Sequence, residues 1–363
     1  MYGVENGGWV LHHNTDMWGD AAPQDNYIYS TWWASAAPWM VSHQMEKYRF
    51  TGDTTYLRNV YPNLKSAAQF FVGFLSDYEG YKVVNPTISP ENAYILPSDN
   101  LTAVAITLGA TMDTELLWEL FNSIKEANEL LHLGDDAFVS QLEALEAKLP
   151  PYRENYFGGL QEWIHDYQEA IPGIDHLSPL WAAYPGNQIT SYNMTLFNWA
   201  RETLNHRLQR QLRYAGWLKG LLLQSHESVS TAGSPSGYSP PPSYGGSSAN
   251  QTLTAAFTGD VNKAPLIRLL PALPEAFAAA GGGGYVSGLR ARGGFEVGIV
   301  WDAKGGLVSA NITSLIGGTA YVTLGDTPIG QSNGTAVKAD GAGSGVFLKL
   351  NTQAGKSYGV TNA

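Results

Sequence analysis

Residues 85–96 read NPTISPENAYIL and carry a single carboxylate, Glu91, between two apolar runs. Pro86 and Pro90 fix φ at their own positions and disfavour helical geometry at the residue before each. The stretch therefore predicts a rigid loop, which can aim one carboxyl group. Two interpretations of Glu91 follow: a general acid presented into a cleft, or an acidic side chain at the start of a helix after a proline.

The composition is that of a globular protein and excludes several classes of partner. The 363 residues suffice for two domains, and the hydrophobic fraction of 44% is ordinary for a folded chain. The net charge of −11 argues against nucleic acid, which requires a basic face. No apolar run reaches the ~18 residues of a membrane span. The 11 Trp and 20 Tyr favour carbohydrate only weakly, because aromatic rings also fill cores.

Cysteine and sequon usage bear on the compartment. The absence of Cys from the sequence excludes a disulfide framework and Cys-ligated metals. The first residues do not read as a signal peptide, since no basic segment precedes an apolar one. Asn-X-Ser/Thr sequons, which chance also produces in Asn- and Thr-rich chains, would accept glycans in the secretory route; they begin at Asn100, Asn193, Asn250, Asn311 and Asn333.

Histidine, Asp and Trp concentrate in residues 7–25, GGWVLHHNTDMWGDAAPQD. The adjacent side chains of His12 and His13 diverge in regular structure, which disfavours a metal site. The preferred interpretation is a polar patch walled by Trp, including Asp16 and Trp18, that binds hydroxyl groups. The alternative is a hydrogen-bonded network that shapes the loop.

Apolar residues recur at helical spacing in four segments. These segments are residues 29–50, 53–74, 113–131 and 135–149. Pro38 either bends the first helix or begins its main portion. Helix pairs joined by short turns, with functional residues in the loops between pairs, predict an α/α toroid or a helical bundle.

A second polar and aromatic segment covers residues 161–186, QEWIHDYQEAIPGIDHLSPLWAAYPG. Its acidic residues stand beside Trp, Tyr and His176: they are Glu162, Asp166, Glu169 and Asp175. Glycoside hydrolysis needs two carboxyl groups, one to protonate the leaving oxygen and one to activate water or attack. Sequence spacing does not say which of them faces Glu91, and a solvated surface position is the expectation for each taken singly.

The composition changes at residues 230–251, where Ser, Gly and Pro dominate and predict a flexible connector. From about Gly284, short β-rich runs alternate with Gly turns and predict a small antiparallel β module. These runs are FEVGIVW, LVSANITSL, TAYVTLG, GVFLKL and SYGVTN. The predicted domains are a partial α/α-toroid catalytic domain at 1–227, a Ser/Gly/Pro-rich flexible insert at 228–262 and a C-terminal β domain at 263–363.

A series of stretches resembles glycoside hydrolase family 95, the α-L-fucosidases, in the family's order. They are GGWVLHHNTDMWGDAAP, MEKYRFTGD, SPENAY, ATMDTELLWELF, LQEWIHDY, YPGNQI, LLLQSH, LLPALP and GLRARGGFEV. The resemblance implies a mainly α fold, an incomplete (α/α)6 toroid followed by a small antiparallel β-sandwich domain. It also implies a fucosylated oligosaccharide or glycan as substrate, neither metal nor organic cofactor, and, with the sequons, an extracellular location.

By match to the SPEN motif, the resemblance implies that Glu91 is the general acid of an inverting reaction, in which water attacks the opposite face of the sugar. The implied substrate-binding residues are His12, His13, Asp16, Trp18 and His176. At residues 174–180 the chain reads IDHLSPL where the family reads HRHLSHL. His176 and Ser178 are kept, while Asp175 replaces an Arg and reverses the local charge.

The base side of the family's mechanism has no counterpart in the sequence. The family's Asn pair lies in a segment before HHNTD, upstream of Met1, and its catalytic Asp lies in an IDGNFG segment before LLLQSH. Between Gln209 and Leu221 the chain has only RQLRYAGWLKG. The resemblance therefore implies a truncated and internally deleted member: either an α-L-fucosidase, or a catalytically impaired fragment or sugar-binding remnant. A different toroid enzyme, a phosphorylase or trehalase, would need acid or phosphate motifs that we do not find.

Overall fold

A computed structural model describes residues 7–20, 27–190, 193–210, 265–270, 282–324, 329–331, 335–338 and 346–362. The chain forms two compact units, one mainly helical and one built mainly of strands. The connector predicted at 228–262 lies outside the described residues. Within the described ranges, no helix is both long and apolar enough to cross a membrane.

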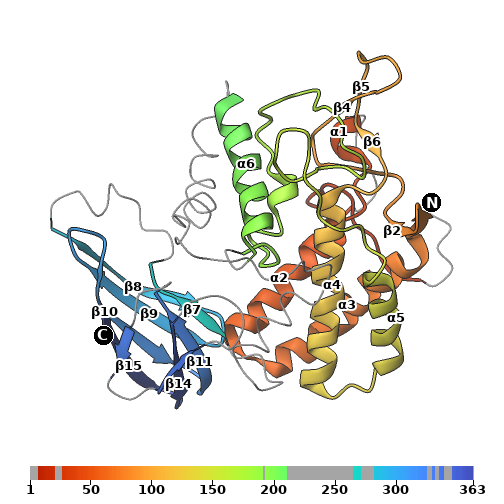
Figure 1. Cartoon of the computed structure of the whole chain (residues 1–363). Helices are drawn as coiled ribbons and strands as arrows, with labels where there is room; N and C mark the ends of the chain where they lie inside the picture. Colours follow the sequence, from red (N-terminus) through yellow and green to blue (C-terminus); the bar gives the residue numbers. More distant parts are fainter. Residues whose placement is uncertain are drawn as a thin grey trace. The chain divides into compact units, whose positions relative to one another are not determined.

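Six α-helices are found in the described part of the chain (Figure 1). They are α1 Ile28–Thr31, α2 Ala36–Thr51, α3 Thr54–Phe74, α4 Thr111–Leu131, α5 Asp136–Glu146 and α6 Met194–Arg210. The four predicted helices are confirmed as α2 to α5. Of the two interpretations of Pro38, the one in which it begins the main portion of the helix is confirmed, because α1 ends at Thr31 and Pro38 lies in the first turn of α2, where its missing N–H has no cost. Helix α6 was not predicted.

Helix α4 forms the centre of the helical unit and packs against both α3 and α5. Its apolar side is fully buried, at Leu116, Leu117, Leu120, Phe121 and Ile124. From α3, the ring of Phe70 lies 5.1 Å from that of Phe71 and 5.0 Å from that of Phe74. Each such burial stabilises the fold by about 1.5–3 kcal/mol. A closed or incomplete ring of helix pairs stays a prediction.

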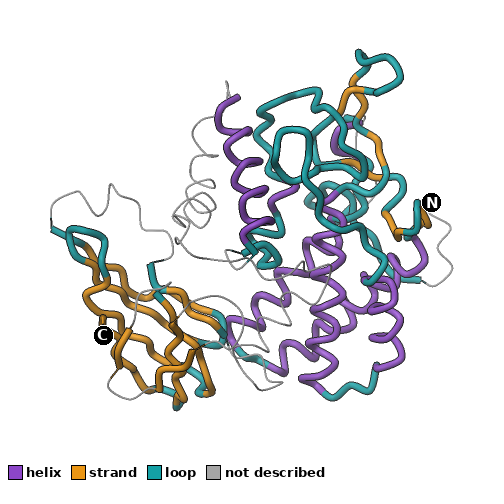
Figure 2. The backbone as a smooth tube through the Cα atoms, in the orientation of Figure 1, coloured by secondary structure: helices purple, strands orange, loops and turns teal. Residues whose placement is uncertain are grey.

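The long loops of this unit gather beyond one end of the helices (Figure 2). The loop between α3 and α4 contains two short antiparallel pairs that flank Glu91. Strand β3 (Thr87–Ile88) pairs with β6 (Ile106–Thr107), and β4 (Tyr94–Ile95) pairs with β5 (Ala103–Val104). A further hairpin, β1 (Ser76–Tyr78) with β2 (Tyr81–Val83), follows α3. The predicted loop is therefore tied to its neighbours on both sides of the carboxylate.

The strands of the second unit form two sheets. The first has the order β12-β15-β10-β9-β8 and the second β13-β14-β11-β7. Their bounds are β7 Leu266–Arg268, β8 Gly284–Ala291, β9 Phe295–Trp301, β10 Leu307–Ser314, β11 Gly318–Thr323, β12 Ile329–Gln331, β13 Thr335–Lys338, β14 Val346–Thr352 and β15 Lys356–Asn362.

One apolar core lies between the two sheets, which makes the unit a β-sandwich. Val297 and Ile312 of the first sheet share it with Val322 and Leu350 of the second. The five predicted runs are confirmed as β9, β10, β11, β14 and β15. The prediction of purely antiparallel pairing is wrong at one edge, where β7 pairs with β11 in parallel. This strand arrives from a distant part of the chain, so no hairpin dictates its direction.

Candidate active site

Glu91 occupies the tip of a bend whose backbone is tightly held. Its φ is 57°, a left-handed conformation that costs a non-glycine residue about 1–3 kcal/mol. Its N–H donates to the carbonyl of Tyr29 at 2.8 Å, and the N–H of Asn92 donates to the carbonyl of Ser89 at 3.0 Å. Because β4 follows at Tyr94, the interpretation of Glu91 as a residue in the first turn of a helix is wrong.

The side chain of Glu91 is 44% exposed and meets His176. The Nε2 atom of His176 lies 3.0 Å from Oε2 of Glu91. His176 is held just before the short 3-10 helix η1 (Ser178–Leu180), where Pro179 favours the turn. The Ser178 hydroxyl donates to the carbonyl of Pro90 at 3.5 Å, a long contact between the two loops. The structure thus joins two residues that the sequence predicted as a site.

Two further groups surround this pair. Oδ1 of Asp175 lies 4.0 Å from Nε2 of His176, so the acidic residue at the family's Arg position places a second carboxylate here. Burial, then the charges of Glu91, Tyr29 and Asp175, raise the pKa of the Tyr27 hydroxyl. The rings of Tyr27 and Tyr29 lie 5.3 Å apart. Tyr27 was not predicted, although its place before an aromatic-rich helix offered a weak signal.

The remaining predicted binding residues lie in the segment at 7–20. His12 is 2% exposed, and the neighbouring Leu11 pairs with Ser35 in a parallel bridge. Trp18 is 84% exposed, which leaves its ring open. Oδ1 of Asp16 accepts the backbone N–H of Trp18 at 2.8 Å, a loop-shaping role. That His12, His13, Asp16 and Trp18 bind a sugar stays a prediction.

The expectation that Glu162 and Glu169 lie on the surface is wrong. Both residues belong to a buried ionic network. They are 5% and 4% exposed, and Arg207 of α6 lies between them at 1%. Arg207 Nη2 donates to Glu162 Oε2 at 2.5 Å and Nη1 donates to Glu169. Burial opposes the guanidinium charge, but the two carboxylates outweigh it and raise the pKa of Arg207.

Arg207 was not singled out from the sequence because helix α6 was not predicted. The stretch TLNHRLQ does carry a helical pattern, in which Arg207 falls on the same face as Leu204, and both are buried. A buried Arg needs carboxylate partners. His206 extends the network, with Nε2 2.9 Å from Oε2 of Glu169 and its ring stacked on Phe157 at 3.9 Å.

A second buried acidic pair begins α4. Oδ1 of Asp113 accepts the Ser35 hydroxyl at 2.6 Å and the Trp33 indole N–H at 3.2 Å. Burial raises the pKa of the Asp113 carboxyl to about 7, although these hydrogen bonds favour its ionised form. Burial also raises the pKa of Glu115 well above its ordinary value.

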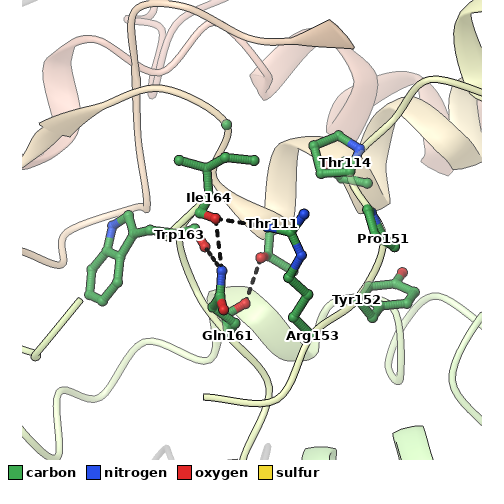
Figure 3. Close-up of a pocket in the computed structure, with 10 residues that line it drawn as sticks. Thr111, Thr114, Pro151, Tyr152, Arg153, Gln161, Trp163 and Ile164 are labelled. Carbon is green, nitrogen blue, oxygen red and sulfur yellow. Dashed lines mark hydrogen bonds between the residues drawn. The ribbon is translucent and has the colours of Figure 1, made fainter. Parts of the chain in front are cut away.

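A small pocket with polar and apolar walls lies beside this helix start (Figure 3). The hydroxyl of Thr111 donates to the carbonyl of Gln161 at 2.6 Å. The Gln161 amide donates to the carbonyls of Trp163 and Ile164 at 2.7 and 2.9 Å. The residues that line the pocket do not include Glu91. Its bonds fix the backbone beside Glu162. In the described part of the chain, no group of His, Asp and Glu has the arrangement of a metal site.

The half-exposed carboxyl of Glu91 beside the imidazole of His176 lies in loops of the helical unit, and the chain also carries a β-sandwich. Family models match both of these parts of the chain. The model of the glycosyl hydrolase family 95 catalytic domain matches residues 1–227. That of the glycoside hydrolase family 95 C-terminal domain matches residues 262–360. The chain belongs to glycoside hydrolase family 95.

Two curated relatives are similar to parts of the chain. Alpha-L-fucosidase 2 of Arabidopsis thaliana is 30% identical over 185 residues, 50% of this chain and 22% of that protein. A probable alpha-fucosidase A of Aspergillus niger is 29% identical over 347 residues, 84% of this chain and 42% of that protein. The chain therefore spans less than half the length of either relative.

Among solved structures, Streptomyces avermitilis α-L-rhamnosidase complexed with L-rhamnose aligns over 91% of this chain and 33% of its own. The TM-score is 0.38 at 13% sequence identity.

Proposed function

We propose that this chain hydrolyses terminal α-L-fucosyl linkages in glycans, with Glu91 as the general acid. Glu91 gives its proton to the departing glycosidic oxygen as the C–O bond breaks. A water molecule attacks the opposite face of the anomeric carbon, so the configuration inverts. The names of the two curated relatives support the choice of fucose.

One observation carries the proposal: the contact of 3.0 Å between Glu91 and His176, two predicted site residues from separate loops. A carboxyl that is half-exposed and held on a strained bend suits a group that must meet a substrate. His176 supports its orientation and offers a second polar group to the sugar. His12, His13, Asp16 and Trp18 complete the proposed site, with the open Trp18 ring suited to a pyranose face.

A second candidate function is fucose binding with little turnover. It is favoured by the interval between Gln209 and Leu221, which holds RQLRYAGWLKG in place of the family segment with the catalytic Asp. A general acid without an activated water loses much of the roughly 10²–10⁴-fold that each acid or base typically supplies. In this case Glu91 and His176 still contact the sugar, but water attacks slowly.

The two functions are separated by binding and turnover measurements on one preparation. Titration with L-fucose, and with D-glucose as a control, measures recognition, while release of 4-nitrophenol from its α-L-fucoside measures hydrolysis. Saturable fucose binding is expected from both functions. Turnover that Glu91→Gln abolishes supports the hydrolase, and binding with negligible turnover supports the second function. Equal affinity for fucose and glucose would contradict both.

We further propose an extracellular location. Among the sequons, Asn100 and Asn311 are exposed, so glycans could attach at both without disturbing the core. Expression in a secretory host, followed by a mass shift on deglycosylation, tests this. An unmodified Asn100 in secreted protein would argue against that site.

A further inference from the structure

The buried carboxylate of Glu162 contacts the Glu91 bend on both of its sides. We propose that Glu162, paired with Arg207, is the positioning residue that fixes the direction of the Glu91 carboxyl. The inference deepens the proposed function, because positioning matters for chemistry only if Glu91 meets the sugar. The ion pair of Glu162 and Arg207 acts on the backbone of the bend and does not contact the half-exposed Glu91 side chain.

A single oxygen of Glu162 closes the bend. Oε1 accepts the Ser89 hydroxyl at 2.6 Å and the Asn92 amide at 3.0 Å. Ser89 stands two residues before Glu91 and Asn92 one residue after it, and both are 0% exposed. One acceptor thus bridges the two ends of the strained turn, which would otherwise relax from its left-handed conformation.

Hydrogen bonds also fix which way the side-chain amide of Asn92 points. Its Oδ1 accepts the backbone N–H of Ala93 at 2.8 Å, so its NH₂ group must face Glu162. An acceptor is therefore required at position 162. A carboxylate supplies that acceptor at Oε1 while Oε2 faces Arg207, whereas the NH₂ group of a glutamine would face the guanidinium.

Arg207 makes the buried carboxylate tolerable and ties it to a second support. Without a counter-charge, burial of the Glu162 carboxylate would strongly destabilise the fold. Arg207 also binds Glu169, whose backbone forms an antiparallel bridge with Tyr94. In the same segment the N–H of Ala170 donates to the carbonyl of Ala93 at 2.9 Å. One guanidinium therefore holds the chain just before and just after Glu91.

The test compares Glu162→Gln with Glu146→Gln in the full chain. Glu146 is a matched control, since it is buried and paired with Lys125 at 2.9 Å but lies on α5, away from the bend. Hydrogen exchange at residues 89–93 is expected to accelerate about tenfold or more in Glu162→Gln, because the two hydrogen bonds to Oε1 lose the charge of their acceptor and the glutamine NH₂ group faces the guanidinium of Arg207. In Glu146→Gln, exchange at these residues is expected to stay as in the unsubstituted chain.

A second readout separates positioning from a merely structural role. The ¹⁵N signal of His176 Nε2 reports its contact with Glu91, and Glu91→Gln calibrates the shift that loss of this carboxylate produces. Glu162→Gln is expected to move the signal in the same direction. If Glu162→Gln fails to fold, Ser89→Ala removes one bridging bond and leaves the pair with Arg207 intact.

Faster exchange together with a moved His176 signal, both absent from Glu146→Gln, supports the inference. Faster exchange with an unmoved His176 signal overturns it, since Glu162 would then stabilise the loop without orienting Glu91. Unchanged exchange overturns it as well. Both readouts are made without substrate, so a failure of the chain to bind L-fucose would count against the proposed function and leave the positioning result standing.

Discussion

Glu91 Oε2 and His176 Nε2 lie 3.0 Å apart, although 85 positions separate the two residues in the chain. The contact joins the loop after α3 to the loop after α5, and it leaves the Glu91 carboxyl 44% exposed. A carboxyl that is fixed and still reachable can give a proton to a bound molecule. The following predictions depend on this arrangement or on the buried groups that support it.

Replacing His176 is expected to weaken fucose binding. His176→Ala removes the hydrogen-bonding partner of Glu91, and we expect the Kd for L-fucose to rise about tenfold, the size of one charged hydrogen bond. His43→Ala serves as the control, because His43 is exposed on α2 and contacts the carbonyl of Trp39. Calorimetric titration checks the result. Equal Kd values for the two variants would contradict the role of His176.

The left-handed backbone of Glu91 predicts an order of stability among its substitutions. Glycine adopts a φ of 57° without the clash that a Cβ atom causes, whereas alanine keeps the clash. Glu91→Gly is therefore expected to unfold with a free energy about 1 kcal/mol higher than Glu91→Ala. Urea denaturation of both variants measures the difference. A more stable alanine variant would show that the bend is not strained.

Loss of Arg207 is expected to destabilise the helical unit strongly. Arg207→Met leaves two buried carboxylates without their counter-charge, a change that costs about 3–5 kcal/mol. Lys125→Met, which removes the partner of the single buried carboxylate of Glu146, should cost less. Thermal and urea unfolding at neutral pH compare the two. An Arg207→Met variant as stable as the parent chain would contradict the buried network.

The raised pKa of Asp113 predicts that the free energy of unfolding falls as pH rises. Its pKa is raised by burial from 3.8 to about 7, so the folded state keeps a proton that the unfolded chain loses near pH 4. The free energy of unfolding should therefore decrease between about pH 4 and 7, by on the order of 4 kcal/mol from this group. Glu115, with its raised pKa, acts with the same sign.

Asp113→Asn tests this pH dependence. The Asn side-chain oxygen can still accept from Ser35 and Trp33, but the group no longer titrates. The slope of unfolding free energy against pH is expected to flatten in this window and to retain the part due to Glu115. Urea unfolding from pH 4 to 8 measures it. An unchanged slope would show that Asp113 does not carry the effect.

The sequence predicted the elements whose patterns are local. The apolar spacing of α3 and α4 and the alternation in β9 and β10 each depend on neighbours within a few residues, and the structure confirms them. Pro90 likewise predicted the bend that holds Glu91. Helix α6 escaped prediction because its apolar face is interrupted by Arg207, whose burial depends on carboxylates about 40 residues away.

The site was predictable only in part, for the same reason. His176 and Glu91 could each be singled out as polar residues among aromatic ones, but their contact depends on how two loops fold over α4. Glu162 was expected at the surface because a charge without a visible partner normally stays in water. Its partners Ser89 and Asn92 come from another loop, so no local pattern revealed them.

Proton donation by Glu91 is tested by the way the rate of Glu91→Gln depends on the leaving group. Azide is added as a nucleophile that needs no general base, so the test holds whether or not water is activated. Azide bonds to the anomeric carbon as the C–O bond breaks, and the departing oxygen takes the Glu91 proton. Initial rates are compared for phenyl and 2,4-dinitrophenyl α-L-fucosides, since only the phenolate needs protonation to leave.

We predict that Glu91→Gln lowers the rate for the phenyl fucoside about 10²-fold or more. The same substitution should lower the rate for the dinitrophenyl fucoside far less. Equal losses on both substrates, no loss on either, or no reaction of the unsubstituted chain even with azide would contradict the assignment of Glu91 as the proton donor.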